Sequence, residues 1–341
     1  MAESDIAMKQ YMSAKHRFAD FFNVFTFGGR QIIKPDQLTT VDSESGIIAW
    51  CNKVIERNLA GMSKSEIQTA KRTLWRHRDI IMEWNNGTYL SLLACETQDK
   101  VHYAMPVRNI LYDALSYTDQ MRQIWDNLTK EEKKDITDGE FFSRFRKQDK
   151  IVPVITTVFH YGEDKWDGNC SLYDMFDSSC SDDYDYIHKF VPDYKINLVD
   201  INKIDNLSLF RSDLGLVFGL VQCRDSKEKT RQFANEHKDF FEAVDYETMT
   251  AISVMTNGGD KFARLMGDGK KVYNMCKAYQ EMYEEGVEHG WNNGRNDGIR
   301  KSIILLRNVG TADDLIANMI MSEYNISAEE VQAFMNAVTN I

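Results

Sequence analysis

Apolar residues recur every three or four positions over long stretches of the chain, which is the spacing of amphipathic helices. Residues 5–27 follow this spacing and stop at Gly28-Gly29, a pair suited to ending a helix. The same spacing predicts helices within residues 43–77 and 207–285, and Pro106 is well placed to open another. Much of the chain is therefore predicted to be helical.

Continuous apolar runs at residues 152–161 and 194–201 have the length and character of buried strands. Two further runs, residues 79–84 and 88–96, flank Asn86-Gly87, the residue pair that favours a two-residue hairpin turn. Strands of this kind between helical segments predict an α/β fold, with a central mixed sheet flanked by helices.

The predicted hairpin brings acidic residues together. A two-residue turn at Asn86-Gly87 would place Asp79 opposite Ala94, and side chains two apart on a strand share a face. Asp79, Glu96 and Gln98 are then expected on one face, with the Cα atoms of the two acids roughly 7–8 Å apart. Carboxylates that close repel each other unless they hold a cation, and such oxygen ligands suit Mg²⁺ or Mn²⁺. The alternative is that both acids only mark the solvated ends of the strands.

Near the C-terminus glycine recurs at every fourth position, at Gly286, Gly290, Gly294 and Gly298. On a helix these residues form one stripe, and each glycine costs about 1 kcal/mol relative to alanine. Two interpretations remain: a helix that packs closely against a partner, or a flexible tether. Residues 271–341 are predicted to form a helical C-terminal region beside a larger domain at 1–270.

Charge is distributed unevenly along the chain. The net charge is −11, which is not typical of a nucleic-acid-binding protein. Residues 53–78, however, carry seven Lys or Arg against two Glu. Lys71, Arg72 and Arg76 in this segment are candidates for contact with DNA phosphates, although a solvated helical face explains the same pattern.

Composition favours a folded protein outside the membrane. The 341 residues are 43% hydrophobic and 27% charged, as in globular proteins. The six cysteines form no CxxC motif, which is consistent with reduced thiols. Residues 1–17 lack the apolar core of a signal peptide, and the longest apolar stretch is too short to span a bilayer. We therefore expect a cytoplasmic protein.

Five sequence blocks follow one another along the chain, and their order carries a family resemblance: RFADFFNVFTFGGRQIIKPDQL, DIIMEWNNGTYLSLLACETQ, VHYAMPVRNILYDALSY, VPVITTVFHYGEDKWDGNCSLYDMFD and EEGVEHGWNNGRNDG. In this order they resemble the recombination-promoting nuclease and transposase (Rpn) family of bacterial PD-(D/E)XK proteins. The resemblance implies a restriction-endonuclease-like core and DNA cleavage that depends on Mg²⁺ or Mn²⁺.

The resemblance also implies roles for individual residues. Asp79 and Glu96 correspond to the two metal-binding acids, and Gln98 stands where lysine is usual. An amide can orient a water molecule but lacks the positive charge of lysine. Lys100 continues the same face by strand parity and could substitute for it, or could simply lie in the loop that follows.

Three further residues are accessory candidates. Asp20 would be the acid of the first helix in this family, or merely a polar break in an apolar helix face. Arg108 and Tyr112 lie four residues apart and share a helix face, where they would brace the site, contact phosphate or serve packing.

The leading hypothesis is a DNA endonuclease linked to recombination or mobile elements, with a homo-oligomer formed through the C-terminal region. A second hypothesis is a DNA-binding or oligomerising protein that keeps the nuclease fold without efficient chemistry. A third is a small-molecule phosphoesterase that uses the same carboxylates.

Overall fold

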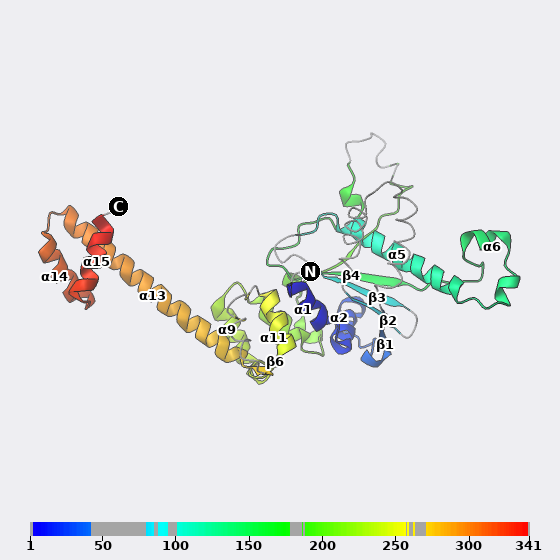
Figure 1. Ribbon diagram of the computed structural model, residues 1–341, viewed down its shortest axis with the longest axis horizontal. Coiled ribbons are helices and arrows are strands. Elements are labelled where there is room, and N and C mark those ends of the chain that lie inside the picture. Colours follow the sequence, from blue (N-terminus) through cyan, green and yellow to red (C-terminus); the bar gives the residue numbers. More distant parts are fainter. Residues whose placement is uncertain are drawn as a thin grey trace, which may run out of the picture.

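The computed structural model describes residues 3–41, 80–84, 88–94, 101–177, 186, 188–256, 258, 262 and 271–339. Within these ranges the chain is a mixed α/β protein with a five-stranded sheet, surrounding helices and a helical C-terminal end (Figure 1). This agrees with the predicted fold class at the level of a mixed sheet flanked by helices. The helices expected within residues 43–77 lie outside the described residues.

The sheet has the order β1-β2-β3-β4-β5. Its strands are β1 (Leu38–Thr40), β2 (Ile80–Trp84), β3 (Tyr89–Ala94), β4 (Val154–His160) and β5 (Asn197–Asp200). The first three are antiparallel neighbours, whereas β3, β4 and β5 run parallel. The strands predicted from the two long apolar runs are confirmed as β4 and β5. The sequence does not predict the edge strand β1, because three residues are too few to show a period.

The hairpin of β2 and β3 is confirmed, but its predicted register is wrong by one residue. Ile80 pairs with Leu92, whereas a two-residue turn would have paired it with Leu93. The last contact before the turn is the bond from the backbone N–H of Trp84 to the carbonyl oxygen of Thr88, at 2.9 Å. Both faces of this hairpin are apolar, so the hydrophobic pattern cannot select the register. A shift of one residue exchanges the faces of a strand, so this pairing does not support a shared face for Asp79 and Glu96.

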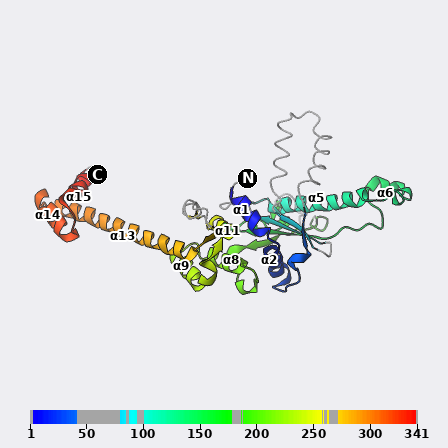
Figure 2. The ribbon, with the colours of Figure 1, turned by 60° about the horizontal axis from the view of Figure 1, so that its bottom comes forward.

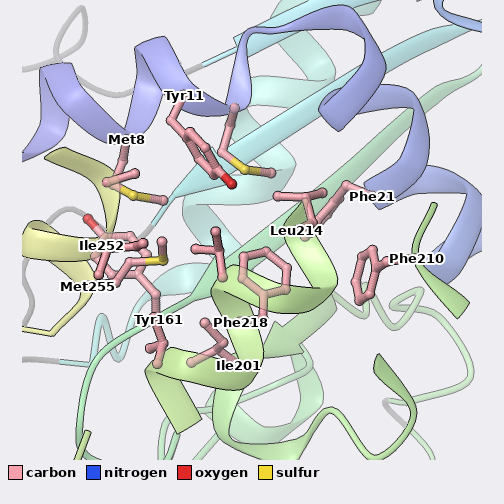
Figure 3. Close-up of a cluster of buried hydrophobic side chains, with 14 of the residues drawn as sticks. Met8, Tyr11, Phe21, Tyr161, Ile201, Phe210, Leu214, Phe218, Ile252 and Met255 are labelled. Carbon is pink, nitrogen blue, oxygen red and sulfur yellow. The ribbon is translucent and has the colours of Figure 1, made fainter. Parts of the chain in front are cut away.

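One face of the sheet carries the main core. Over it lie α1 (Glu3–Met12), α2 (Lys15–Phe27), α8 (Leu214–Gln222) and α11 (Tyr246–Met255). Figure 3 shows their side chains meeting, among them Met8, Tyr11, Phe21, Phe218 and Ile252. The single helix predicted over residues 5–27 is therefore two helices. Its predicted end is confirmed, since Gly28 adopts the left-handed conformation (φ 63°) that glycine tolerates.

The other face carries α5 (Met105–Asp126), which begins at Ala104 with Pro106 in its first turn, as predicted. Beyond its C-terminal end, residues 127–150 form a small projection that contains η2 (Glu132–Lys134) and α6 (Asp138–Ser143). We call residues 127–150 the distal lobe. It lies at the far end of α5 in Figures 1 and 2, away from the other helices.

The second half of the chain leads to a long helix. Its elements include α9 (Lys227–Glu236), α10 (Lys238–Phe241) and a short ribbon of β6 (Val244–Asp245) and β7 (Val272–Tyr273). The short 3-10 turns are η1 (Pro35–Gln37), η3 (Tyr173–Met175), η5 (Ile201–Lys203) and η6 (Leu207–Leu209). Within the described part of residues 207–285, the predicted helical pattern is confirmed by α8 to α11 and by the helix that begins at Met275, and the ribbon interrupts it.

The C-terminal end has a core of its own. The helix α13 (Met275–Asn308) runs outward to α14 (Asp313–Tyr324) and α15 (Ala328–Thr339) (Figure 1). The last part of α13 packs with these two helices through Ile299, Ile303, Ile316, Ile320, Val331 and Met335. The first part belongs to the main core. The division into residues 1–270 and 271–341 stays a prediction, since packing alone does not test whether the parts fold separately.

The sequence of the C-terminal end carries two capping-box patterns, Thr311 to Asp314 and Ser327 to Glu330, and each predicts the start of a helix. The one at Ser327 is confirmed, since its backbone N–H donates to Glu330 Oε2 at 2.9 Å and Glu330 N–H donates to Ser327 Oγ at 3.2 Å. The one at Thr311 is wrong, because α14 is capped by Ala312 without a side-chain bond. Across the described residues, no helix is both long and apolar enough to cross a membrane.

Candidate functional site

The predicted metal-binding and catalytic residues lie beside described strands but outside the described residues themselves. This holds for Asp79, Glu96, Gln98 and Lys100, and also for the DNA-contact candidates Lys71, Arg72 and Arg76. The strands next to Asp79 and Glu96 in the chain, β2 and β3, are described. The pairing of Ile80 with Leu92 brings the start of β2 and the end of β3 to the same end of the sheet. Asp79 directly precedes the first strand and Glu96 follows the second by two residues.

Asp20 lies on α2, where its side chain is 3% exposed. Its Oδ2 accepts hydrogen bonds from the backbone N–H groups of Arg211 at 2.8 Å and Ser212 at 2.7 Å. The Ser212 hydroxyl donates to the same oxygen at 2.6 Å. The carboxylate therefore anchors the turn that precedes α8. These contacts favour a structural role, and no local sequence pattern points to partners 191 and 192 positions away.

Arg108 and Tyr112 share a face of α5, as predicted. The Arg108 Nε donates to the Tyr112 hydroxyl at 3.3 Å, and the guanidinium carbon lies 5.6 Å from the centre of the tyrosine ring. Tyr112 is buried, whereas Arg108 is half-buried. The tyrosine thus holds the arginine in one orientation near the N-terminal end of the helix.

A polar network fixes α5 on the sheet, and sequence reasoning missed it. Asp113 accepts hydrogen bonds from the hydroxyls of Thr156 on β4 and of Tyr194 before β5, both at 2.5 Å. The Asn109 amide donates to the Tyr194 hydroxyl at 2.9 Å. Burial, reinforced by Asp113, raises the pKa of Tyr194 well above its ordinary value, so the phenol stays protonated. A spacing of four between Asn109 and Asp113 on the inner face of α5 was the available signal.

The turn after β4, which contains Trp166 and Gly168, serves the fold. The Trp166 indole N–H donates to the Gly168 carbonyl at 2.8 Å. The Trp166 backbone N–H donates to Asp200 Oδ2 at 3.4 Å, which ties this turn to the end of β5. Arg224 donates to the Tyr161 carbonyl at 2.9 Å and so secures the start of the same turn. These bonds fasten the turn after β4 to the end of β5 and to Arg224.

A divalent metal ion needs several oxygen, nitrogen or sulfur ligands within reach of one point. No group of three or more His, Cys, Asp or Glu among the described residues could hold such an ion. The oxygen donors predicted for magnesium, Asp79 and Glu96, lie outside those residues, and their role stays a prediction.

Residues 110–250, from within α5 to within α11, match a family model described as "Putative transposase, YhgA-like". This segment, less than half of the chain, is similar to the YhgA-like transposase family. The match confirms the resemblance to the Rpn family that the sequence blocks indicated. The transposase-family segment contains β4, β5 and the network around Asp113, whereas β2 and β3 precede it. No curated protein and no solved structure matches the chain.

Proposed function

We propose that the chain is a Mg²⁺-dependent DNA endonuclease that hydrolyses phosphodiester bonds during recombination or the movement of mobile elements. The similarity of residues 110–250 to a transposase family supports DNA as the substrate. The observation that carries the proposal is the antiparallel pairing of β2 and β3. It brings the chain that leads into Ile80 and the chain that leaves Ala94 to one end of the sheet, which is where the two acids attach.

In this proposal Asp79 and Glu96 bind the ion, and Gln98 orients a water molecule. Carboxylate and amide oxygens are the donors that Mg²⁺ prefers. Two regular strands in the observed register would direct residues 79 and 96 to opposite faces. The proposal therefore requires one irregular step, such as a β-bulge, between the described strands and the acids.

A bound Mg²⁺ would supply a more acidic water molecule and positive charge at the phosphate. Lys71, Arg72 and Arg76 would contact phosphates along the DNA. Arg108, held by Tyr112, is placed to stabilise charge near the same end of the sheet, because guanidinium groups pair well with phosphate oxygens.

The test is nicking of supercoiled plasmid by the purified chain with Mg²⁺ and with a chelator. We expect cleavage only with Mg²⁺, and we expect Asp79→Ala and Glu96→Ala each to abolish it, because each removes a ligand of the shared ion. Asp205→Ala, which removes an exposed carboxylate between β5 and α8, is the matched control and should cleave as the parent does. Cleavage at the parental rate by either site variant would overturn the assignment.

Gln98 supports a second function, a DNA-binding protein without efficient chemistry, because the position lacks the lysine charge. That function predicts DNA binding by the parent without Mg²⁺-dependent cleavage. The plasmid assay, run beside a binding assay, separates the two.

A further inference from the structure

The distal lobe exposes two large aromatic side chains. Phe141 is 59% exposed and Phe142 is 91% exposed, both on α6. Figure 2 shows this helix at the end of the molecule opposite α14 and α15, beyond the last turn of α5. A single exposed apolar side chain is ordinary, but two adjacent exposed rings on one short helix form an apolar surface of the kind that marks an interaction site.

The lobe that carries these rings is held together tightly. Glu140 accepts hydrogen bonds from the backbone N–H groups of Thr137 and Lys147, both at 3.0 Å, which closes the chain on each side of α6. The Arg144 guanidinium carbon lies 4.8 Å from the centre of the Phe141 ring. Phe141 also meets Trp125 of α5, with ring centres 6.3 Å apart. The exposure of Phe142 is therefore a fixed feature of the lobe.

Some charged side chains of the lobe form ion pairs, and others do not. Glu132 and Asp149 both pair with Arg146, at 3.0 and 2.8 Å, and Glu140 is used in the chain closure described above. Among the described residues, six exposed basic side chains of the lobe make no ion pair: Lys130, Lys133, Lys134, Arg144, Lys147 and Lys150. Three exposed acids there are also unpaired: Glu131, Asp135 and Asp138. With every acid counted, residues 127–150 carry seven Lys or Arg against six Asp or Glu, so the lobe has a net charge of +1 on a chain whose net charge is −11. Six of its basic side chains are nevertheless exposed and available to an anionic partner.

We propose that the distal lobe is a second DNA-binding surface. Its lysine and arginine side chains contact phosphates, and the Phe142 ring stacks on a base or inserts at a base step. Exposed lysine and arginine side chains on the same lobe as an exposed aromatic ring fit this polymer, because phosphates attract the charges and bases offer flat apolar faces. The proposal rests on DNA as the substrate of the proposed nuclease, and it extends the contact well beyond the cleavage site.

The length of α5 sets the distance between the two DNA contacts. The helix continues from Arg108 to Asp126, which at 1.5 Å per residue spans about 27 Å. That length corresponds to about eight base pairs of duplex at 3.4 Å each. A duplex that touches Arg108 and the lobe would therefore extend about three quarters of a helical turn along α5.

The test measures binding of the full chain to a fluorescent 30-base-pair duplex over a range of salt concentrations, without Mg²⁺. We expect Phe142→Ala to weaken binding about tenfold with little change in salt dependence, because a ring contact releases no counterions. Lys133→Glu with Lys147→Glu should instead flatten the log–log salt dependence by about one unit for each phosphate that the variant no longer neutralises.

Matched controls keep these effects specific. Phe190→Ala removes another exposed ring, 74% exposed, outside the lobe, and should bind as the parent does. Lys229→Glu with Lys301→Glu makes the same change in net charge on α9 and α13 and should leave the salt slope nearly unchanged. Circular dichroism confirms that each variant is folded.

The outcomes distinguish this proposal from the nuclease proposal. If the parent cleaves plasmid and both lobe variants bind DNA as the parent does, the lobe proposal fails alone. If the lobe variants lose DNA binding while the parent shows no Mg²⁺-dependent cleavage, the lobe proposal stands and the nuclease proposal fails. If the parent binds no DNA, the lobe proposal is wrong. Binding to anionic vesicles is measured beside DNA binding, and if the lobe variants lose only the binding to vesicles, the lobe proposal is also wrong.

Discussion

Asp20 joins two segments that lie far apart in the chain. Its carboxylate accepts three hydrogen bonds from Arg211 and Ser212, and two of these come from backbone N–H groups. Groups buried without a partner are costly, so the carboxylate stabilises the approach of α2 to α8. The same residue is the acid that the Rpn resemblance would assign to the first helix, and a measurement can separate the two roles.

Asp20→Ala should lower the free energy of unfolding by about 2–3 kcal/mol, because it strands two backbone N–H groups. Urea denaturation followed by circular dichroism measures this change. Asp36→Ala, at an exposed position in η1, is the control and should have little effect. Parental stability combined with loss of Mg²⁺-dependent cleavage would instead place Asp20 in the nuclease site.

Glu132 gives the distal lobe a pH dependence. Hydrogen bonds from the Thr129 backbone, and next from Arg146, lower the pKa of the Glu132 carboxyl from 4.5 to about 2. A carboxyl with a lowered pKa stabilises the fold above its unfolded pKa, and it loses that contribution as the pH falls through the folded value. The contacts of Glu132 should therefore be intact at neutral pH and weaken between about pH 4.5 and pH 2.

Side-chain NMR titration of Glu132 measures this directly, and we expect a midpoint near the lowered value. Arg146→Ala should move the midpoint upward, because it removes the second of the two causes. A midpoint at the ordinary glutamate value in the parent would show that the bonds to Thr129 and Arg146 do not form in solution.

At the scale of elements, the sequence predicted what depends on local pattern. Gly28 ends α2 and Pro106 lies in the first turn of α5, because each residue has a backbone preference that acts locally. The apolar runs of β4 and β5 were recognised because strands buried on both faces need continuous hydrophobicity.

What escaped prediction depends on distant partners. The register of β2 and β3 is one residue away from that expected, because the two apolar faces are interchangeable in the pattern. The partners of Asp20 and Asp113 come from segments that only the fold brings near. For the candidate site, the sequence predicted that Arg108 and Tyr112 would share one face of a helix, and this is confirmed. The assignment of Asp79, Glu96 and Gln98 stays a prediction.

At the scale of the whole molecule, the glycine stripe of α13 lies close to other described side chains at its two ends and not at its centre. A side-chain carbon added at Gly286 would lie 3.2 Å from Lys227 Nζ, and one at Gly298 would lie 3.3 Å from the Tyr324 hydroxyl. At Gly290 and Gly294 it would meet nothing within 4 Å. The centre of the stripe is thus open to a second copy of the chain, and the homo-oligomer stays a prediction.

Gly290→Leu with Gly294→Leu should abolish pairing through this stripe, because leucine prevents close approach of two helix backbones. Light scattering at micromolar concentration should then show a dimeric parent and a monomeric variant. Alanine at the same positions is a milder comparison, which should stabilise the helix by about 1 kcal/mol per site. A parent that is already monomeric, or a variant that remains dimeric, would contradict pairing through Gly290 and Gly294.

The helix α13 also sets the angle at which the two cores face each other. Between Tyr279 in the main core and Ile299 in the C-terminal core it continues as one helix, so both cores are attached to the same uninterrupted α-helix. Each residue of an α-helix advances the axis by 1.5 Å and turns it by about 100°. Deleting one residue between these positions would swing the C-terminal helices by about a quarter turn, whereas deleting seven would shorten the helix by about 10 Å and nearly restore their heading. Changes in length here therefore alter direction far more than distance.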